Sequence, residues 1–116
     1  MTGDDILLQA RLWWWQRTSA MALAFCVLVH LGVIIYAVHA GLSAASLLGR
    51  TRGNVVFGAF YTLFVLACAI HAPIGLMNVA REWLGWRPRP VGWLAAAFAL
   101  AIVVLGLRAV YGVVVA

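Results

Sequence analysis

The chain has 116 residues, of which 66% are hydrophobic, and only 11 of its side chains are charged: eight arginines and three acids. A soluble domain of this length needs more polar side chains to cover its surface, so the composition excludes a soluble globular protein. The net charge of +5 comes from the arginines. In a membrane protein, the placement of arginines indicates orientation in the bilayer, so this charge does not point to nucleic-acid binding.

Residues 1–17 are predicted to form a short amphipathic lead-in on the cytoplasmic side of the membrane. Asp4 and Asp5 suit the start of a helix, because the helix dipole favours negative charge there. Three consecutive tryptophans, 13–15, are typical of an anchor at the membrane interface. We therefore divide the chain into this lead-in and a membrane anchor over residues 18–116.

The anchor contains three long apolar runs. A hydrocarbon core about 30 Å thick requires roughly 20 helical residues, and each run is long enough. We predict transmembrane helices over about 18–41, 55–80 and 91–115. A polar hairpin at 48–54 separates the first two, and a loop at 81–90 containing two prolines separates the last two. The predicted fold class is an all-α membrane protein with three transmembrane helices.

The arginines predict the orientation of these helices. Five of them fall at the end of the bundle that holds the N-terminus, namely Arg11, Arg17, Arg81, Arg87 and Arg89. The opposite loop holds only Arg50 and Arg52. Because cytoplasmic loops are enriched in basic residues, the N-terminus is expected in the cytoplasm. Arg108, in the third helix, is expected either to snorkel outward or to pair with an anionic group inside an assembly.

A stripe of small and polar residues runs along the second predicted helix. At about 100° per residue, His71, Gly75, Asn78 and Glu82 fall within about 40° of one another. We call these four residues the polar stripe. A transmembrane helix rarely turns such a face toward lipid, so the polar stripe is expected to meet another helix or a ligand.

His71 has two possible roles. It lies ten residues before Arg81, or about 15 Å deeper at 1.5 Å per residue. At that depth an imidazole either hydrogen-bonds to a neighbouring helix or serves as an axial ligand of haem iron. Gly75, one turn further on, leaves room for a flat macrocycle or for the close approach of another helix.

The other two histidines lie in the first predicted helix. His30 is thirteen residues past Arg17, so we expect its depth to be close to that of His71 or slightly beyond it. His30 is either a second haem ligand, for the same haem or another, or a helix contact. His39 is expected near the far interface, where water can solvate it.

Polar and aromatic residues also gather at the expected cytoplasmic edge of the bundle. Residues 16–19 and 81–83 either form an ordinary interfacial belt or ring a wedge between helices. In such a wedge, Arg17, Ser19 or Trp83 would donate hydrogen bonds to a quinone headgroup, and Glu82 would be the carboxylate for proton transfer. No hydrolytic constellation is present in the sequence, so no catalytic side chain is assigned, and redox chemistry would belong to a bound cofactor.

The segment from His71 to Trp83 resembles a motif of the membrane-anchor subunits of succinate dehydrogenase and fumarate reductase, which together make up the complex II family. That motif reads His-Ala-x-Ile-Gly, a few residues, then Asp-Tyr, and the match is best to the D-type, cytochrome b anchor. Residues 16–20, entering the first helix, and 110–115, ending the third, are weaker matches.

The resemblance implies roles for particular residues. His71 would be an axial ligand of haem b iron, with the second ligand supplied by a partner anchor. Some relatives carry two haems, and His30 would fit the first-helix ligand of that scheme. Glu82 and Trp83 occupy the Asp-Tyr positions of the quinone site. Glutamate keeps the carboxylate, whereas the tryptophan N–H cannot accept a hydrogen bond as a phenol oxygen can.

The resemblance also implies partners and a location. The chain would anchor a flavoprotein and an iron–sulfur subunit to the inner membrane of a bacterium, beside a second membrane-anchor subunit. Its substrate would be ubiquinone or menaquinone, and it would contact membrane lipid but no nucleic acid. The alternatives are a haem-free anchor of a quinol:fumarate reductase, in which His71 only packs, and a small non-redox membrane transporter or assembly protein.

Overall fold

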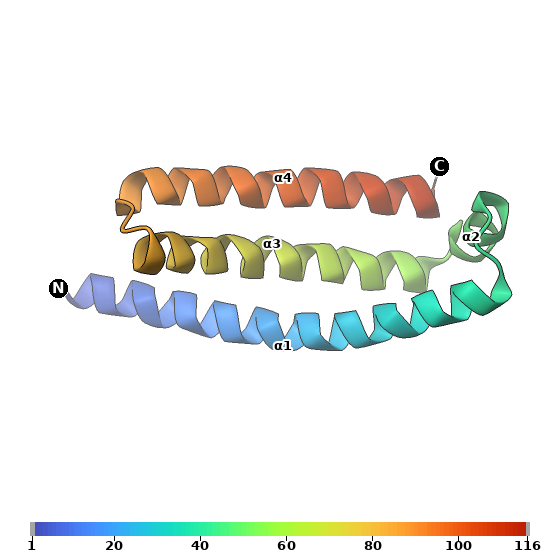
Figure 1. Ribbon diagram of the computed structural model, residues 1–116, viewed down its shortest axis with the longest axis horizontal. Coiled ribbons are helices and arrows are strands. Elements are labelled where there is room, and N and C mark those ends of the chain that lie inside the picture. The colour runs from blue at the N-terminus through green and yellow to red at the C-terminus, as the bar shows by residue number, and fades with distance from the viewer. Residues whose placement is uncertain (1, 116) are drawn as a thin grey trace.

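The computed structural model describes residues 2–115, which form four helices and no strands (Figure 1). The helices are α1 (Gly3–Ala40), α2 (Ala44–Thr51), α3 (Val55–Trp83) and α4 (Pro88–Val114). Helices α1, α3 and α4 are long and apolar enough to cross a membrane. The predicted all-α class and the three membrane-length helices are therefore confirmed.

Helix α1 continues without a break through the predicted lead-in and the first crossing. A capping box starts it: the Thr2 side chain accepts from the backbone N–H of Asp5, and the Asp5 carboxylate accepts from the backbone N–H of Thr2. The sequence has neither glycine nor proline from residue 4 to residue 31, so nothing ends the helix near residue 17. It stops before Gly41, whose φ of 126° few other residues adopt.

The connections differ from the predicted ones. The predicted hairpin is largely occupied by α2, which begins after Ser43, whose hydroxyl accepts from the backbone N–H of Ser46. Asn54 caps α3 in the same way. Helix α3 continues to Trp83, and α4 begins at Pro88, because proline is well suited to the first turn of a helix.

Helix α3 lies in the middle of the bundle, with α1 packed on one side and α4 on the other (Figure 1). Both α1 and α4 run antiparallel to α3. The start of α1 and the α3–α4 loop share one end, which we call the N-terminal end. The other end holds α2 and the end of α4, and we call it the α2 end. The most buried residues are mainly small, including Cys26, Ala67, Ala80 and Ala95, as expected where transmembrane helices pack closely.

Gly106 lies at a tight contact between α3 and α4, and its replacement by alanine is expected to destabilise the fold. A Cβ atom at Gly106 would lie 2.6 Å from Val65 Cγ1 and 2.8 Å from Cγ2, and the β-branched valine has little freedom to rotate away. We expect Gly106→Ala to lower the free energy of unfolding by about 1–3 kcal/mol. Unfolding in mixed detergent and SDS, followed by far-UV circular dichroism, measures this change.

Gly112→Ala is the matched control, because a Cβ atom added there meets nothing within 4 Å. Alanine favours a helix over glycine by up to about 1 kcal/mol, so this variant should be as stable as the wild type or slightly more stable. Equal losses for the two variants would contradict the described α3–α4 packing.

Candidate functional site

The inner half of the polar stripe meets α1. His71 Nδ1 lies 3.5 Å from Ser19 Oγ, and a Cβ atom added at Gly75 would lie 3.3 Å from Gln16 Nε2. The space next to Gly75 holds the end of the Gln16 side chain from α1. The glutamine side chain occupies the space that a macrocycle would need at that position.

The hydrogen bonds around His71 leave one ring nitrogen free. Ser19 is buried, with 4% of its surface exposed, and its hydroxyl donates to the Gln16 carbonyl oxygen over 3.0 Å. Since the Ser19 hydroxyl proton is used in that bond, Ser19 Oγ is placed to accept a hydrogen bond from His71 Nδ1. An imidazole protonated on Nδ1 keeps a lone pair on Nε2, and a metal-binding histidine is commonly held in this way. The donor chemistry of His71 therefore fits an iron ligand.

The outer half of the polar stripe lines a small cavity between α1 and α3, which we call the N-terminal cavity. Its volume is about 230 Å³. Within it, Arg81 donates to Asn78 Oδ1 over 2.9 Å. The Gln16 Oε1 atom is buried and has no hydrogen-bond partner within residues 2–115. The lining residues are Gln9, Leu12, Trp13, Gln16, Asn78, Arg81 and Glu82. The cavity thus offers donors, an unused acceptor and a carboxylate.

Of the four residues predicted for the quinone site, only Glu82 lines this cavity. Trp83 follows it at the end of α3, with 82% of its surface exposed, and Ser19 lies buried beside His71. Arg17 is exposed, and its guanidinium carbon lies 5.1 Å from the Trp13 ring centroid. The structure therefore does not bring the four predicted residues together in one site.

The structure also corrects the expected depths of the histidines. Ser19 contacts His71, while His30 contacts Tyr61. Tyr61 precedes His71 on α3 by ten residues, or about 15 Å. The expectation that His30 and His71 lie at similar depths is therefore wrong, because it assumed that Arg17 and Arg81 are level. In this arrangement the two imidazoles of one chain cannot be the two axial ligands of one iron.

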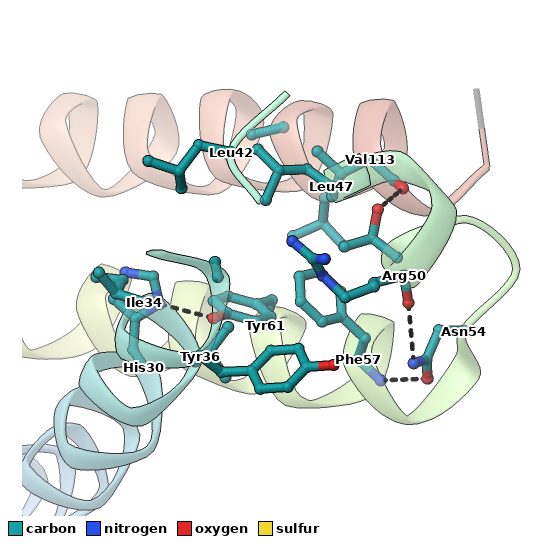
Figure 2. A pocket seen from close by; sticks show the side chains of 15 residues that line it. His30, Ile34, Tyr36, Leu42, Leu47, Arg50, Asn54, Phe57, Tyr61 and Val113 are labelled. Carbon is teal, nitrogen blue, oxygen red and sulfur yellow. Dashed lines mark hydrogen bonds between the residues drawn. The ribbon is translucent and has the colours of Figure 1, made fainter. Parts of the chain in front are cut away.

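His30 instead lines a larger cavity at the other end of the bundle, which we call the α2-end cavity (Figure 2). Its volume is about 580 Å³, and all four helices contribute to its lining. His30 Nδ1 and the Tyr61 hydroxyl are 2.6 Å apart, and Arg50 is the one charged residue in the lining. His39 is exposed in the last turn of α1, outside this cavity.

The α2-end cavity is not among the sites predicted from the sequence. Tyr61 and Arg50 were available as signals, because one is a polar aromatic in an apolar helix and the other a charge in a short loop. Their relation to His30 depends on how α1 and α3 are aligned, and on the folding of residues 44–51 as a helix. Neither fact follows from hydropathy.

The short contact between His30 and Tyr61 is expected to stabilise the bundle. Hydrogen bonds between transmembrane helices contribute about 0.6 kcal/mol on average and up to about 1.7 kcal/mol. We expect a double-mutant cycle of His30→Phe and Tyr61→Phe, measured by SDS unfolding, to give a coupling energy in the upper part of this range. Strictly additive effects would show that the hydrogen bond contributes nothing.

Comparison with known proteins gives no family for this chain: no family model, curated protein or solved structure matches it. Within residues 2–115, no three or more histidine, cysteine or acidic side chains are grouped to hold a metal ion. An iron at His71 would therefore need further ligands that these residues do not supply together, such as the nitrogens of a macrocycle.

Proposed function

We propose that this chain is the haem b-binding membrane anchor of a succinate:quinone oxidoreductase. The observation that supports this best is the hydrogen-bonded chain from His71 Nδ1 through Ser19 to the Gln16 carbonyl, which leaves Nε2 as a free ligand atom. His71 lines neither of the two described cavities. A second membrane anchor would therefore supply both the other axial ligand and the rest of the haem pocket.

Haem b would supply a one-electron carrier beside the quinone. The residues of this chain would then have distinct tasks. Ser19 would hold the His71 ring in one orientation and one tautomer. Arg81 would donate a hydrogen bond to a quinone oxygen in the N-terminal cavity, and Glu82 would hold the proton that this oxygen takes up on reduction.

The proposed arrangement in the membrane follows from the arginine distribution. The N-terminal end, with five of the eight arginines, would face the cytoplasm of a bacterium with an inner membrane. The iron–sulfur and flavoprotein subunits would bind on that side, so that electrons reach quinone, either ubiquinone or menaquinone, in the N-terminal cavity. Arg17 and Trp83, both exposed at this end, would then lie at the rim of the quinone site rather than within it.

A haem-free anchor of a quinol:fumarate reductase is the second candidate. It is favoured by the contact at Gly75, where Gln16 fills the space next to the His71 turn. In this candidate His71 serves only to hold α1 against α3 through Ser19. The N-terminal cavity would still bind a quinol.

The first experiment is to purify the tagged chain from its own membranes in mild detergent, together with whatever proteins bind it. A dithionite-reduced minus oxidised spectrum of this complex should show the α-band of a b-type haem, and succinate should reduce added quinone. A complex that contains a flavoprotein but no such band would favour the haem-free anchor. Absence of both a flavoprotein and an iron–sulfur protein would contradict the anchor function itself.

A further inference from the structure

The α2-end cavity has a long apolar interior. It lies between α1 and α4 on the face of α3, and α2 closes it at the end of the bundle (Figure 2). Much of its wall is aliphatic or aromatic, including Ile34, Leu47, Phe57 and Val113. A volume of about 580 Å³ falls within the range of about 300–1,000 Å³ that is usual for ligand sites. This interior suits a hydrocarbon chain.

One positive charge lies in this largely apolar lining. Arg50 is half-buried and donates through Nη1 to Ser46 Oγ over 3.0 Å and through Nη2 to the Gly41 carbonyl oxygen over 2.8 Å. Its guanidinium carbon lies 5.5 Å from the Tyr36 ring centroid. These partners are all neutral, so they fix the position of the guanidinium without balancing its charge.

No acidic side chain of residues 2–115 lies near Arg50. Its three acidic residues are Asp4 and Asp5, in the first turn of α1, and Glu82, in the last turns of α3. All three lie at the N-terminal end, and at 1.5 Å per residue Glu82 is roughly 40 Å from the start of α3. A half-buried cation in an apolar site is costly unless an anion accompanies it. Within residues 2–115, no acidic side chain is therefore placed to act as the counter-ion of Arg50.

The guanidinium is able to bind such an anion. It has five N–H donors, and the contacts to Ser46 and Gly41 use two of them. Inside the cavity, His30 Nδ1 and the Tyr61 hydroxyl already hydrogen-bond to each other over 2.6 Å. Tyr61 lies seven residues, or about 10 Å, beyond Asn54 along α3. The site therefore places an anion-binding group near the α2 end and an apolar interior deeper in the bundle.

We propose that the α2-end cavity binds an anionic phospholipid of the surrounding bilayer. The phosphate accepts hydrogen bonds from Arg50, and one acyl chain lies along the apolar wall toward His30 and Tyr61. A phosphate, with several oxygen acceptors, matches the multiple free donors of a guanidinium. The bound lipid supplies the missing negative charge and fills the space between α1 and α4. This inference does not depend on the chain binding haem or quinone.

Native mass spectrometry of the detergent-purified protein tests the proposal. Phosphatidylglycerol and phosphatidylcholine with identical acyl chains are titrated separately, and the dissociation constant of the first bound lipid is measured. We expect phosphatidylglycerol to bind at least about fivefold more tightly, because its net negative charge meets an uncompensated arginine. Arg50→Gln should abolish this preference, whereas Arg50→Lys should retain much of it.

Arg52→Gln is the matched control, because Arg52 is an exposed arginine two residues away that does not line the cavity. It should leave the preference intact. Leu47→Trp, which fills the cavity without changing charge, should weaken binding of both lipids and keeps the test informative if Arg50→Gln fails to fold. Equal binding of the two lipids by the wild type, or equal losses in Arg50→Gln and Arg52→Gln, would overturn the proposal. Displacement of phosphatidylglycerol by a lower concentration of oleate would overturn it in favour of a free fatty acid.

Discussion

Replacing His71 with alanine is expected to remove the b-type α-band from the purified complex, while His30→Ala is expected to leave it in place. The reason is that the contact with Ser19 uses His71 Nδ1 and leaves Nε2 available as a metal ligand. His30 lies about 15 Å further along the bundle, beyond the reach of an iron held by His71. The measurement is the reduced minus oxidised spectrum of each variant, normalised to the amount of protein.

Ser19→Ala separates a ligand role of His71 from a packing role. Losing the partner of a metal-binding histidine typically weakens metal affinity by about 10–100-fold, so this variant should lose haem more readily while His71 is still present. A band that disappears with His30→Ala alone would move the proposed ligand to α1. Partial loss in each histidine variant would indicate two haems, one for each residue.

Replacing Glu82 with glutamine is expected to slow quinone reduction by the assembled complex by about 100-fold or more, the usual contribution of a positioned acid or base. Glu82 supplies the one carboxylate in the lining of the N-terminal cavity, and glutamine keeps its size while removing its proton chemistry. Steady-state reduction of a short-chain quinone by succinate measures the rate. The haem spectrum of the variant should be unchanged.

Trp83→Phe is the control for Glu82→Gln. The two residues are adjacent, but Trp83 lies outside the cavity with most of its surface exposed. Its replacement should therefore leave the rate close to that of the wild type. A loss of activity in Trp83→Phe without one in Glu82→Gln would show that quinone binds at the rim of the bundle. In that case the N-terminal cavity would not be the quinone site.

The three membrane-crossing segments are predicted from the sequence because length and hydropathy determine them directly. The sequence also predicts the polar stripe, since residues 71, 75, 78 and 82 share one face of any α-helix, and the structure turns this face toward α1. The helix formed by residues 44–51 was not predicted, because eight residues give a weak periodic signal. The continuous α1 was missed for a different reason, which is that tryptophans at 13–15 suggested a boundary where the backbone has none.

The alignment of α1 with α3 is what the sequence could not supply. The prediction placed Arg17 level with Arg81 as two markers of one interface. In the structure, the contact of Ser19 with His71 puts Arg17 about 12 Å deeper than Arg81. The Arg17 guanidinium lies over Trp13, one turn nearer the N-terminus, so a long side chain can reach the interface from this depth. The position of an arginine in a sequence therefore locates the membrane interface only approximately, because its backbone can lie as far from the interface as its side chain can reach.

The unbroken α1 has a mechanical consequence for any protein that binds the N-terminal end. Its 38 residues make a rod about 57 Å long, well beyond a hydrocarbon core of about 30 Å. With no glycine or proline between residues 4 and 31, the rod has no hinge between its first turns and Ser19. A partner that tilts those first turns would therefore also displace Ser19, and the displacement of Ser19 would change the orientation of the His71 ring.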